Sequence, residues 1–372
     1  MRVGVPKEIK VEEYRVGLTP AAAHEFVAHG HEVLVEAGAG AGIGSGDDEY
    51  VAAGAAVVAT AAEIFGQADM IVKVKEPQAA EWAMLRDGQI LFTYLHLAPD
   101  PDQTRGLIDS GCVAVAYETV TDLGGGLPLL APMSEVAGRL SIEAAAFSLR
   151  RTAGGPGVLM GGVPGVAPAR VMVIGGGVVG LHAARMAAGL GAEVVILDRS
   201  LPRLRQIDEL FGGRIATAFS TAHEIERQAC MADAVIGAVL VPGARAPKLI
   251  TRPMLAKMKR GAVLVDVAID QGGCFETSRP TTHDDPVFTV DGITHYCVAN
   301  MPGAVPRTSS FALGNATLPF GLALADHGLD ALRADPHLRA GLNVFHGKLT
   351  NAPVGASLGM DAITPEEALG LA

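Results

Sequence analysis

Short apolar segments alternate with amphipathic ones over the first 120 residues. The apolar segments predict strands at 2–5, 32–36, 55–58, 70–75, 89–95 and 113–117. Helices are predicted between them, for example at 61–67 and 101–110. The first helix follows Thr19 and Pro20, a good N-cap residue and a proline at the first helical position, and runs to Gly30. Because strands that alternate with helices form a parallel sheet covered by helices, this region is predicted to be α/β.

A connection rich in glycine and proline separates this region from a second one with the same pattern. The segment 123–132, LGGGLPLLAP, interrupts the alternation and indicates a boundary between domains. Ser134 then stands where it can cap a long helix from 135 to about 151. From Arg170 the alternation resumes, with strands predicted at 171–174, 193–197, 214–218, 234–239, 262–269 and 295–299.

A second long helix is predicted at 308–327, although Gly314 or Pro319 can end or kink it. The tail after this helix is expected to be helical or irregular and to lie on a surface. The two halves share one plan, and a long helix stands near each boundary. The sequence therefore predicts two similar α/β domains with parallel sheets, joined by long helices across a cleft. A hydrophobic content of 49% is sufficient for two packed cores.

The most specific motif is the glycine-rich turn in RVMVIGGGVVGLHAARMAAGLGAEVVILD. Gly175, Gly177 and Gly180 form G-x-G-x-x-G between an apolar strand and a helix, and the next strand ends at Asp198, 23 residues after Gly175. The first glycine permits a tight turn, the second lets the backbone approach a pyrophosphate, and the third allows close helix–strand packing. A purely structural turn is the alternative, but the complete βαβ context favours a Rossmann-like dinucleotide site at the helix N-terminus.

Asp198 favours NAD over NADP as the dinucleotide. A carboxylate at the end of this strand accepts hydrogen bonds from the adenosine ribose and repels a 2′-phosphate. Arg199 is adjacent and complicates this prediction, because an arginine there can hold a 2′-phosphate.

Four polar residues are predicted near carboxyl ends of strands, where ligands bind in open α/β sheets. Lys75 ends the run in MIVKVKEP, and His96 ends the run in QILFTYLHLAP. Asp270 ends AVLVDVAIDQGG, and Arg15 lies in EEYRVGLTP after the first strand. Each has a plain alternative: a solvated lysine, a core histidine, a loop-capping carboxylate or a surface arginine. Asp266, within the strand, is better explained as a structural group.

Together the four residues match what the oxidation of an amino acid requires. Arg15 and Lys75 supply two cations for a carboxylate, the arginine in a bidentate manner. Histidine is the side chain that most readily exchanges protons near neutral pH, which makes His96 the predicted acid–base catalyst. The Asp270 carboxylate can stabilise a cationic amine or iminium.

The net charge of the chain limits the kinds of binding partner that it can have, and its cysteines indicate the cellular compartment. The formal net charge is −11 with no basic cluster, which argues against nucleic acid or an anionic membrane as a partner. The N-terminal MRVGVPKEIK lacks an apolar signal core, and no apolar run approaches the ~18–20 residues of a membrane span. Sparse cysteines without metal-like spacing favour a reducing cytoplasm; they are Cys112, Cys230, Cys274 and Cys297.

From residue 1 to about 330 the chain resembles the alanine dehydrogenase family, which is related to the NAD-binding part of proton-translocating transhydrogenase. The segments that carry the resemblance are PKEIK, EYRVGLTP, KVKEP, LFTYLHLA, LPLLAPMSEVAGR, GVLMGGVPGV, VIGAVLVPGA, DVAIDQGGCFE and VANMPGAVPRTSS. The resemblance implies a discontinuous substrate domain, 1–127 plus 307–372, into which an NAD-binding domain, 128–306, is inserted. It also implies a homohexamer that interconverts L-alanine with pyruvate and ammonia.

The same resemblance implies roles for individual residues. Arg15 and Lys75 would bind the substrate carboxylate, and His96 and Asp270 would be the catalytic pair. Ser134 would contact the cofactor phosphates, Asp198 the ribose, and Ser220 the adenine. Arg203 stands where the family often has lysine in a cofactor-facing position, which keeps the charge. The further cofactor-binding residues would be Gly175, Gly177, Val178, Val179, Gly180, Val239, Leu240, Val267, Ala268, Ile269, Arg279, Val298, Ala299, Asn300 and Met301.

Two other functions and one metal question stay open. An NAD-binding transhydrogenase subunit would need a membrane partner chain, but LPLLAPMSEVAGR lacks the R-A-Q-type loop of that family. A catalytically inactive NAD sensor is disfavoured by the presence of all four polar residues. Glu118 and His327 lie near the predicted hinge and could share a cation, although surface roles suit them better.

Overall fold

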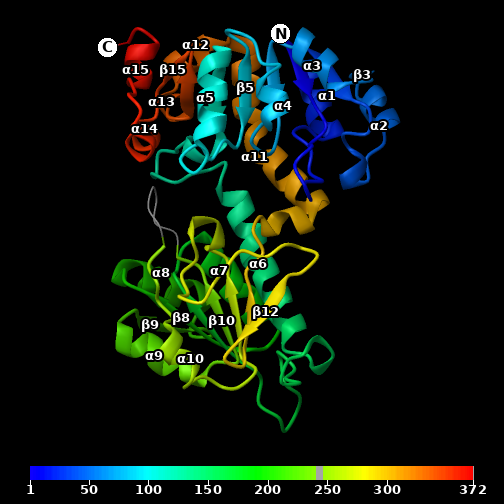
Figure 1. Cartoon of the computed structure of the whole chain (residues 1–372). Helices are drawn as coiled ribbons and strands as arrows, with labels where there is room; N and C mark the ends of the chain where they lie inside the picture. Colours follow the sequence, from blue (N-terminus) through cyan, green and yellow to red (C-terminus); the bar gives the residue numbers. More distant parts are fainter. Residues whose placement is uncertain (240–245, 372) are drawn as a thin grey trace. The chain divides into compact units, whose positions relative to one another are not determined.

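The computed structural model describes residues 1–239 and 246–371. It is an α/β protein that divides into two compact units. Unit 1 comprises 1–133 and 305–372, and unit 2 comprises 134–304. Both ends of the chain belong to unit 1, which is blue, cyan, orange and red in Figure 1, while unit 2 is mostly green and yellow. The predicted fold class, two α/β domains with mostly parallel sheets, is confirmed.

Among its described residues, unit 1 holds an eight-stranded sheet in the order β15-β14-β6-β5-β4-β1-β2-β3. The strands from β1 to β6 pair in parallel, and β14 and β15 extend the β6 edge as antiparallel strands. The strand bounds are β1 Arg2–Val5, β2 Glu32–Glu36, β3 Ala56–Val58, β4 Met70–Val72, β5 Ile90–Thr93, β6 Val113–Ala116, β14 Leu342–Phe345 and β15 Lys348–Leu349.

Helices connect and cover these strands (Figure 1). In unit 1 they are α1 Pro20–Ala28, α2 Asp47–Ala52, α3 Ala61–Gln67, α4 Ala79–Trp82, α5 Pro101–Ser110, α11 Pro306–His327, α12 Leu329–Ala334, α13 Pro336–Arg339, α14 Ala352–Leu358 and α15 Pro365–Ala368. Thr19 caps α1 as predicted, since its hydroxyl accepts from the Ala22 N–H and Pro20 follows in the first turn. Helix α11 continues through Pro319, so neither Gly314 nor Pro319 ends it.

The described part of unit 2 forms a seven-stranded sheet in the order β12-β13-β11-β10-β7-β8-β9, parallel except for β12. The strands are β7 Arg170–Ile174, β8 Glu193–Asp198, β9 Ala216–Phe219, β10 Ala234–Gly237, β11 Val263–Asp266, β12 Val287–Val290 and β13 Ile293–Tyr296. Its helices are α7 Val178–Gly189, α8 Leu201–Phe211, α9 Ala222–Met231 and α10 Arg252–Leu255, while α6 Ala131–Ser148 begins in unit 1.

The core of unit 2 lies on both faces of its sheet. Along β7, Val171 and Val173 belong to one hydrophobic cluster, while Met172 and Ile174 belong to another. Neighbouring side chains on a strand point to opposite faces, so the positions after Arg170 in this strand are all apolar and buried. This is why the strand appears in the sequence as a continuous apolar run that leads into the glycine-rich turn.

Two predictions about the elements are wrong. Ser134 does not cap a helix, because α6 begins at Ala131 and places Ser134 inside its first turns. Pro132 is well tolerated there, since the first turn of a helix needs no N–H from it. The C-terminal tail is not only helical or irregular, because β14 and β15 join the sheet with Leu342, Val344 and Leu349 buried.

Candidate active site

Three of the predicted polar residues of unit 1 follow strands that are neighbours in its sheet. Arg15 lies after β1, Lys75 after β4 and His96 after β5, and the sheet order places these strands side by side as β5-β4-β1. The connection after β1 leads to β2 on one side while β4 lies on the other, which makes this the topological switch point of the sheet. Ligands of open α/β sheets bind beyond the strand ends at such a point.

Arg15 is a buried cation with a carboxylate partner, not a surface arginine. Its side chain is 2% exposed, and Glu13 accepts from its Nε at 2.7 Å and from its Nη2 at 2.5 Å. The other terminal nitrogen, Nη1, lies 3.1 Å from the Met133 sulfur. Burial lowers the pKa of Arg15, but the hydrogen bonds and charge of Glu13 outweigh it, so the pKa lies above its ordinary value. The guanidinium is therefore charged and fixed in orientation.

Lys75 is held at the strand end by acidic residues that the sequence analysis missed. Its side chain is 13% exposed, and its Nζ lies 3.4 Å from Glu76 Oε2. Glu8 fixes its backbone, because Oε1 accepts from the N–H groups of Val74 at 2.7 Å and Lys75 at 3.3 Å. Lysine 75 is thus not a solvated strand end.

A second lysine, Lys73, supports the same strand end from inside the protein. It is fully buried and bonds to Glu8 at 2.9 Å and Glu81 at 2.7 Å. Burial lowers the pKa of Lys73, and the two carboxylates reverse this and raise it. A lysine within the apolar run MIVKV was the signal for such a network, because a buried cation requires an acidic partner.

His96 is exposed and held in an unusual backbone conformation. Its side chain is 44% exposed, its φ is 50°, and its ring stacks on Tyr94 at 5.7 Å between centroids. Glu118 Oε1 accepts from the His96 N–H at 2.6 Å and lies 3.9 Å from the imidazole Nδ1. Since positive φ is rare for residues other than glycine, the Glu118 contact stabilises a conformation that presents the imidazole to ligands. The alternative of a core histidine is excluded.

Glu118 also accepts from the Leu95 N–H, so both strand-end amides converge on its carboxylate. Among the described residues, no group of three or more His, Cys, Asp or Glu side chains is placed to hold a metal ion. A cation shared by Glu118 and His327 alone stays a hypothesis.

In unit 2 the glycine turn has the geometry that its sequence predicts. Gly175 has φ 102°, a conformation that favours glycine. A Cβ on Gly180 would lie 1.8 Å from the Gly175 carbonyl oxygen, so only glycine permits this packing of α7 on the turn. A Cβ on Gly177 would meet nothing within 4 Å. Val178 and Val179 begin the helix after it, where N–H groups at a helix start attract anions.

Asp198 and Arg203 hold this turn from the neighbouring strand and helix. Asp198 Oδ2 accepts from the Gly176 N–H at 2.7 Å, and Arg203 Nε donates to the Gly176 carbonyl at 2.6 Å. Ser220, after β9, donates its N–H to the Asp198 carbonyl at 3.0 Å. The predicted ribose and adenine residues are therefore neighbours at the carboxyl end of β8 and β9, beside the turn.

The predicted nicotinamide-side residues follow β10, β11 and β13, which are adjacent and parallel. Val239 follows β10, and Leu240 lies outside the described residues. Val267, Ala268, Ile269 and Asp270 follow β11, and Val298, Ala299, Asn300 and Met301 follow β13. Asp270 is exposed in a short 3-10 helix, Ile269–Gln271. Arg279, the remaining residue of the predicted set, has its guanidinium stacked on the Phe288 ring, 4.1 Å from the ring centroid.

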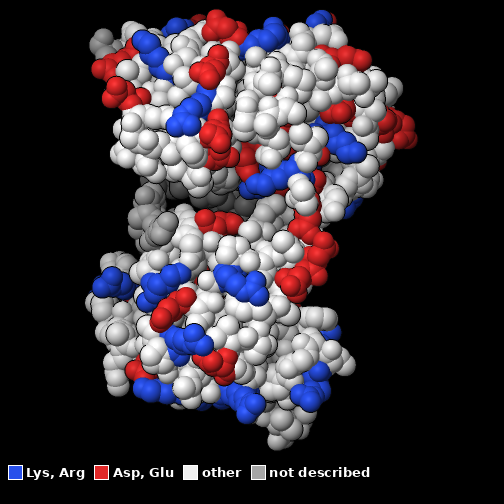
Figure 2. Space-filling model, viewed as in Figure 1, with Lys and Arg blue, Asp and Glu red and all other residues white. Residues whose placement is uncertain are grey.

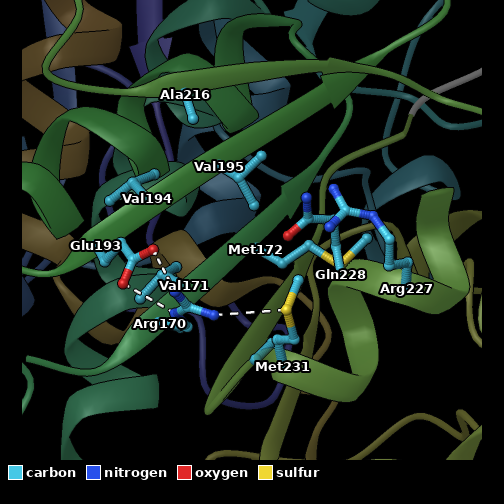
Figure 3. A pocket seen from close by; sticks show the side chains of 11 residues that line it. Arg170, Val171, Met172, Glu193, Val194, Val195, Ala216, Arg227, Gln228 and Met231 are labelled. Atoms are coloured by element: carbon cyan, nitrogen blue, oxygen red, sulfur yellow. Dashed lines mark hydrogen bonds and ion pairs between the residues drawn. The ribbon is translucent and has the colours of Figure 1, made fainter.

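A separate pocket of about 280 Å³ lies at the amino ends of strands of the unit 2 sheet, opposite to the ends that carry the predicted cofactor residues (Figure 3). Arg170, Glu193 and Ala216, which line it, are the first residues of β7, β8 and β9. Of its charged lining residues, Arg170 pairs with Glu193 at 2.8 Å and Arg227 pairs with Glu224 at 2.6 Å. The glycine turn follows the last residue of β7, so this pocket is not the dinucleotide site.

The comparisons with known proteins agree on one family. The N-terminal domain model of alanine dehydrogenase/PNT matches residues 4–137, and the C-terminal domain model matches residues 141–352. The chain belongs to the alanine dehydrogenase/PNT family. It is similar to an alanine dehydrogenase of Halomonas elongata, with 60% identity over 371 residues that cover 100% of both chains. The resemblance that the sequence motifs indicate is thereby confirmed.

Solved structures of this family have the same fold. An L-alanine dehydrogenase matches with a TM-score of 0.94 and 50% identity over 96% of this chain and 99% of that one. A transhydrogenase from Sinorhizobium meliloti matches with a TM-score of 0.81 and 27% identity over 94% and 98%. Both branches of the alanine dehydrogenase/PNT family thus share this architecture, and the higher similarity is to the alanine dehydrogenase.

Proposed function

We propose that this chain catalyses the NAD-dependent oxidative deamination of L-alanine to pyruvate and ammonia, and the reverse reductive amination. The observation that carries the proposal is the placement of Arg15, Lys75 and His96 after three adjacent strands of unit 1. Unit 2 supplies a dinucleotide-binding turn, and a relative named alanine dehydrogenase is 60% identical over the full length.

The substrate carboxylate is assigned to Arg15 and Lys75. A guanidinium and an ammonium that are both largely buried bind an anion more strongly than they would in water, because the surroundings screen their charge less. Glu13 and Glu76 already neutralise part of this charge, which keeps the two cations stable when no substrate is bound.

The proton transfers are assigned to His96. When bound, NAD supplies the acceptor for the hydride that leaves the substrate Cα. A water adds to the resulting iminium carbon, His96 takes a proton from that water, and the carbinolamine collapses to pyruvate and ammonia. We assign to Asp270 the stabilisation of the cationic nitrogen and the orientation of the water.

The described residues at the carboxyl edge of the unit 2 sheet fit NAD. Val178 and Val179 would bind the pyrophosphate through their N–H groups, and Asp198 the ribose. Asp198 has two oxygens, and each accepts one backbone N–H, from Gly176 and Ser200, which leaves lone pairs for hydroxyl donors. The remaining residues of the predicted set, including Ser134, Arg203, Ser220 and Arg279, are proposed to bind the cofactor as the family resemblance implies.

A cofactor preference for NAD follows from the Asp198 carboxylate, which repels a 2′-phosphate. Steady-state rates with NAD and NADP at equal concentration test this, and equal efficiency with both would refute it.

We also propose that the chain is a cytoplasmic homohexamer. Basic and acidic side chains are interspersed over the face of each unit shown in Figure 2. On unit 2, however, Leu159 and Val166 are 64% and 63% exposed, and Phe147, Val163 and Leu190 are exposed as well. Contact between copies would remove such apolar side chains from water. Among the described residues no helix is both long and apolar enough to span a bilayer. Light scattering of the purified protein measures the assembly.

Turnover of L-alanine is the experiment that tests the proposed activity. The purified protein is mixed with NAD and a panel of L-amino acids and glycine, and formation of NADH is followed by absorbance. Rapid turnover with L-alanine and little with larger side chains is expected. No turnover with any amino acid, together with measurable NAD binding, would instead support the transhydrogenase or the NAD-sensing alternative.

A further inference from the structure

Asp266, the last residue of β11, carries a buried carboxylate. Its side chain has no exposed surface, and within the described part of the chain no lysine or arginine forms an ion pair with it. An isolated charge of this kind is costly to bury unless hydrogen-bond donors replace the lost water. The donors that surround Asp266 therefore indicate what it does.

Among the residues that the structure describes, its hydrogen-bond donors come from the loop that follows it. Oδ1 accepts from the N–H groups of Ala268 and Cys274, both at 3.2 Å. Oδ2 accepts from the Phe275 N–H at 3.2 Å and from the Ser278 hydroxyl at 2.5 Å. The Cys274 sulfur lies 3.5 Å from Oδ1 as a further donor. The carboxylate is thus the centre around which the loop 267–278 is folded.

The same loop carries Asp270. The Gln271 and Gly273 N–H groups both donate to the Ala268 carbonyl, at 2.9 and 3.0 Å, which closes a tight turn around Asp270. Gly273 has φ 72°, and a Cβ there would lie 2.6 Å from Asp266 Oδ2. The loop therefore wraps closely around the Asp266 carboxylate and places Asp270 on the exposed side of the turn.

Two cysteine thiols near Asp266, those of Cys274 and Cys297, have raised pKa values. Burial, and secondarily the Asp266 charge, raise the pKa of Cys274 well above its ordinary value. Burial also raises the pKa of Cys297 to about 12. Both thiols therefore stay protonated, and Cys274 remains a donor to the carboxylate.

We propose that Asp266 is a positioning residue for the reaction: its carboxylate gathers the loop 267–278 and thereby fixes the position of Asp270. The proposal rests on the proposed function, in which Asp270 stabilises the cationic nitrogen. A buried group that holds a loop by several hydrogen bonds limits the motion of the side chain which that loop presents. Misplacement by about 1 Å costs up to ~100-fold in rate.

The test is Asp266→Asn, with Asp291→Asn as the matched control in the same unit. The asparagine has nearly the same shape, but its NH₂ group faces donors where the carboxylate accepted, so the loop loses at least one bond. We expect kcat for L-alanine to fall on the order of tenfold or more. The Kd for NAD should change less than kcat does, because the loop carries only the proposed nicotinamide-side residues Val267–Asp270, whereas the Asp198 side of the site is untouched. Asp291 pairs with Arg252 on the surface, and its substitution should leave kcat unchanged.

A double-mutant cycle with Asp270→Asn separates positioning from general damage. If Asp266 acts through Asp270, Asp266→Asn should lower kcat much less in the Asp270→Asn background than in the parent. Equal factors in both backgrounds would overturn the proposal, and so would a kcat within twofold of the parent for Asp266→Asn. If Asp266→Asn fails to fold, Ser278→Ala replaces it in the same cycle, because it removes only the hydroxyl donor to Oδ2. Absence of turnover in the parent protein refutes the proposed function instead, and this outcome is recorded before any variant is compared.

Discussion

The proposed substrate-binding residues of unit 1 and the proposed cofactor-binding turn of unit 2 differ in how the protein holds them. In unit 1 the two candidate cations are largely buried and already paired, Arg15 with Glu13 and Lys75 with Glu76. In unit 2 the cofactor turn consists of backbone, with glycines where any side chain would collide, as at Gly180. One part depends on electrostatic pairing inside the protein, and the other on the close approach of main-chain atoms.

This difference determines how each part can fail. An ion network loses stability when one member is removed, because a partner is left charged and buried. A glycine turn fails when an atom is added, because there is no space for it. Substitutions that delete atoms should therefore damage unit 1 more, and substitutions that add atoms should damage unit 2 more.

The largest effect is expected for Lys73→Met in unit 1. It leaves Glu8 and Glu81 without their shared cation, and breaking a buried pair in this way costs about 3–5 kcal/mol. Denaturant unfolding at neutral pH measures the loss. Lys7→Met is the matched control, since Lys7 is exposed, and it should change the free energy of unfolding by less than about 0.5 kcal/mol. Similar losses for both variants would contradict the importance of the network.

His96→Ala tests the chemistry of unit 1 apart from its stability. The variant should fold normally, because the side chain is exposed, while kcat falls on the order of a hundredfold or more through loss of acid–base catalysis. Steady-state kinetics with L-alanine and the thermal unfolding midpoint are measured together. His24→Ala, at an exposed histidine of α1, should leave both unchanged. A kcat near the parent value would remove His96 from the mechanism.

Gly180→Ala tests the glycine turn of unit 2. The added methyl group collides with the Gly175 carbonyl, and overpacking of this kind costs about 1–3 kcal/mol. The affinity for NAD, measured by calorimetry, should fall as well, because Gly175 and α7 must move apart. Gly189→Ala at the end of the same helix meets nothing within 4 Å and should be neutral or stabilising. If the two variants behaved alike, the close packing at Gly180 would be unimportant.

The same difference explains what the sequence could predict. The strands and the glycine turn were predictable, because continuous apolar runs and fixed glycine spacing are local signals. The partners Glu13, Glu76 and Glu118 were not assigned, because only the folded chain shows which acidic residues meet which cations. Ser134 was misassigned as a cap because α6 begins three residues earlier, at Ala131, and Pro132 fits in its first turn.

Two antiparallel hairpins had local signals that were not used. Asp291 and Gly292 join β12 to β13 with φ values of 51° and 81°, and His346 and Gly347 join β14 to β15 with 44° and 79°. A residue that tolerates positive φ followed by glycine between two short apolar runs is typical of a two-residue hairpin turn. The order of the strands in each sheet, in contrast, depends on pairings between distant segments and has no such local signal.

The smallest expected effect is a pH dependence of the Lys75 pair. Burial raises the pKa of Glu76, but Lys75 and Lys10 outweigh it, so the pKa lies below its ordinary value of 4.5. A carboxylate with a lowered pKa contributes stability that is present above the unfolded value and lost as the pH falls through the folded value. The free energy of unfolding of the parent should therefore exceed that of Glu76→Gln by on the order of 1 kcal/mol at neutral pH. This difference in free energy should shrink below pH 4.5. Lys10→Met removes one of the hydrogen bonds to Glu76 and should show part of the same loss of stability. If the difference in free energy of unfolding between the parent and Glu76→Gln stayed constant with pH, the paired charge of Glu76 would add nothing to the stability of unit 1.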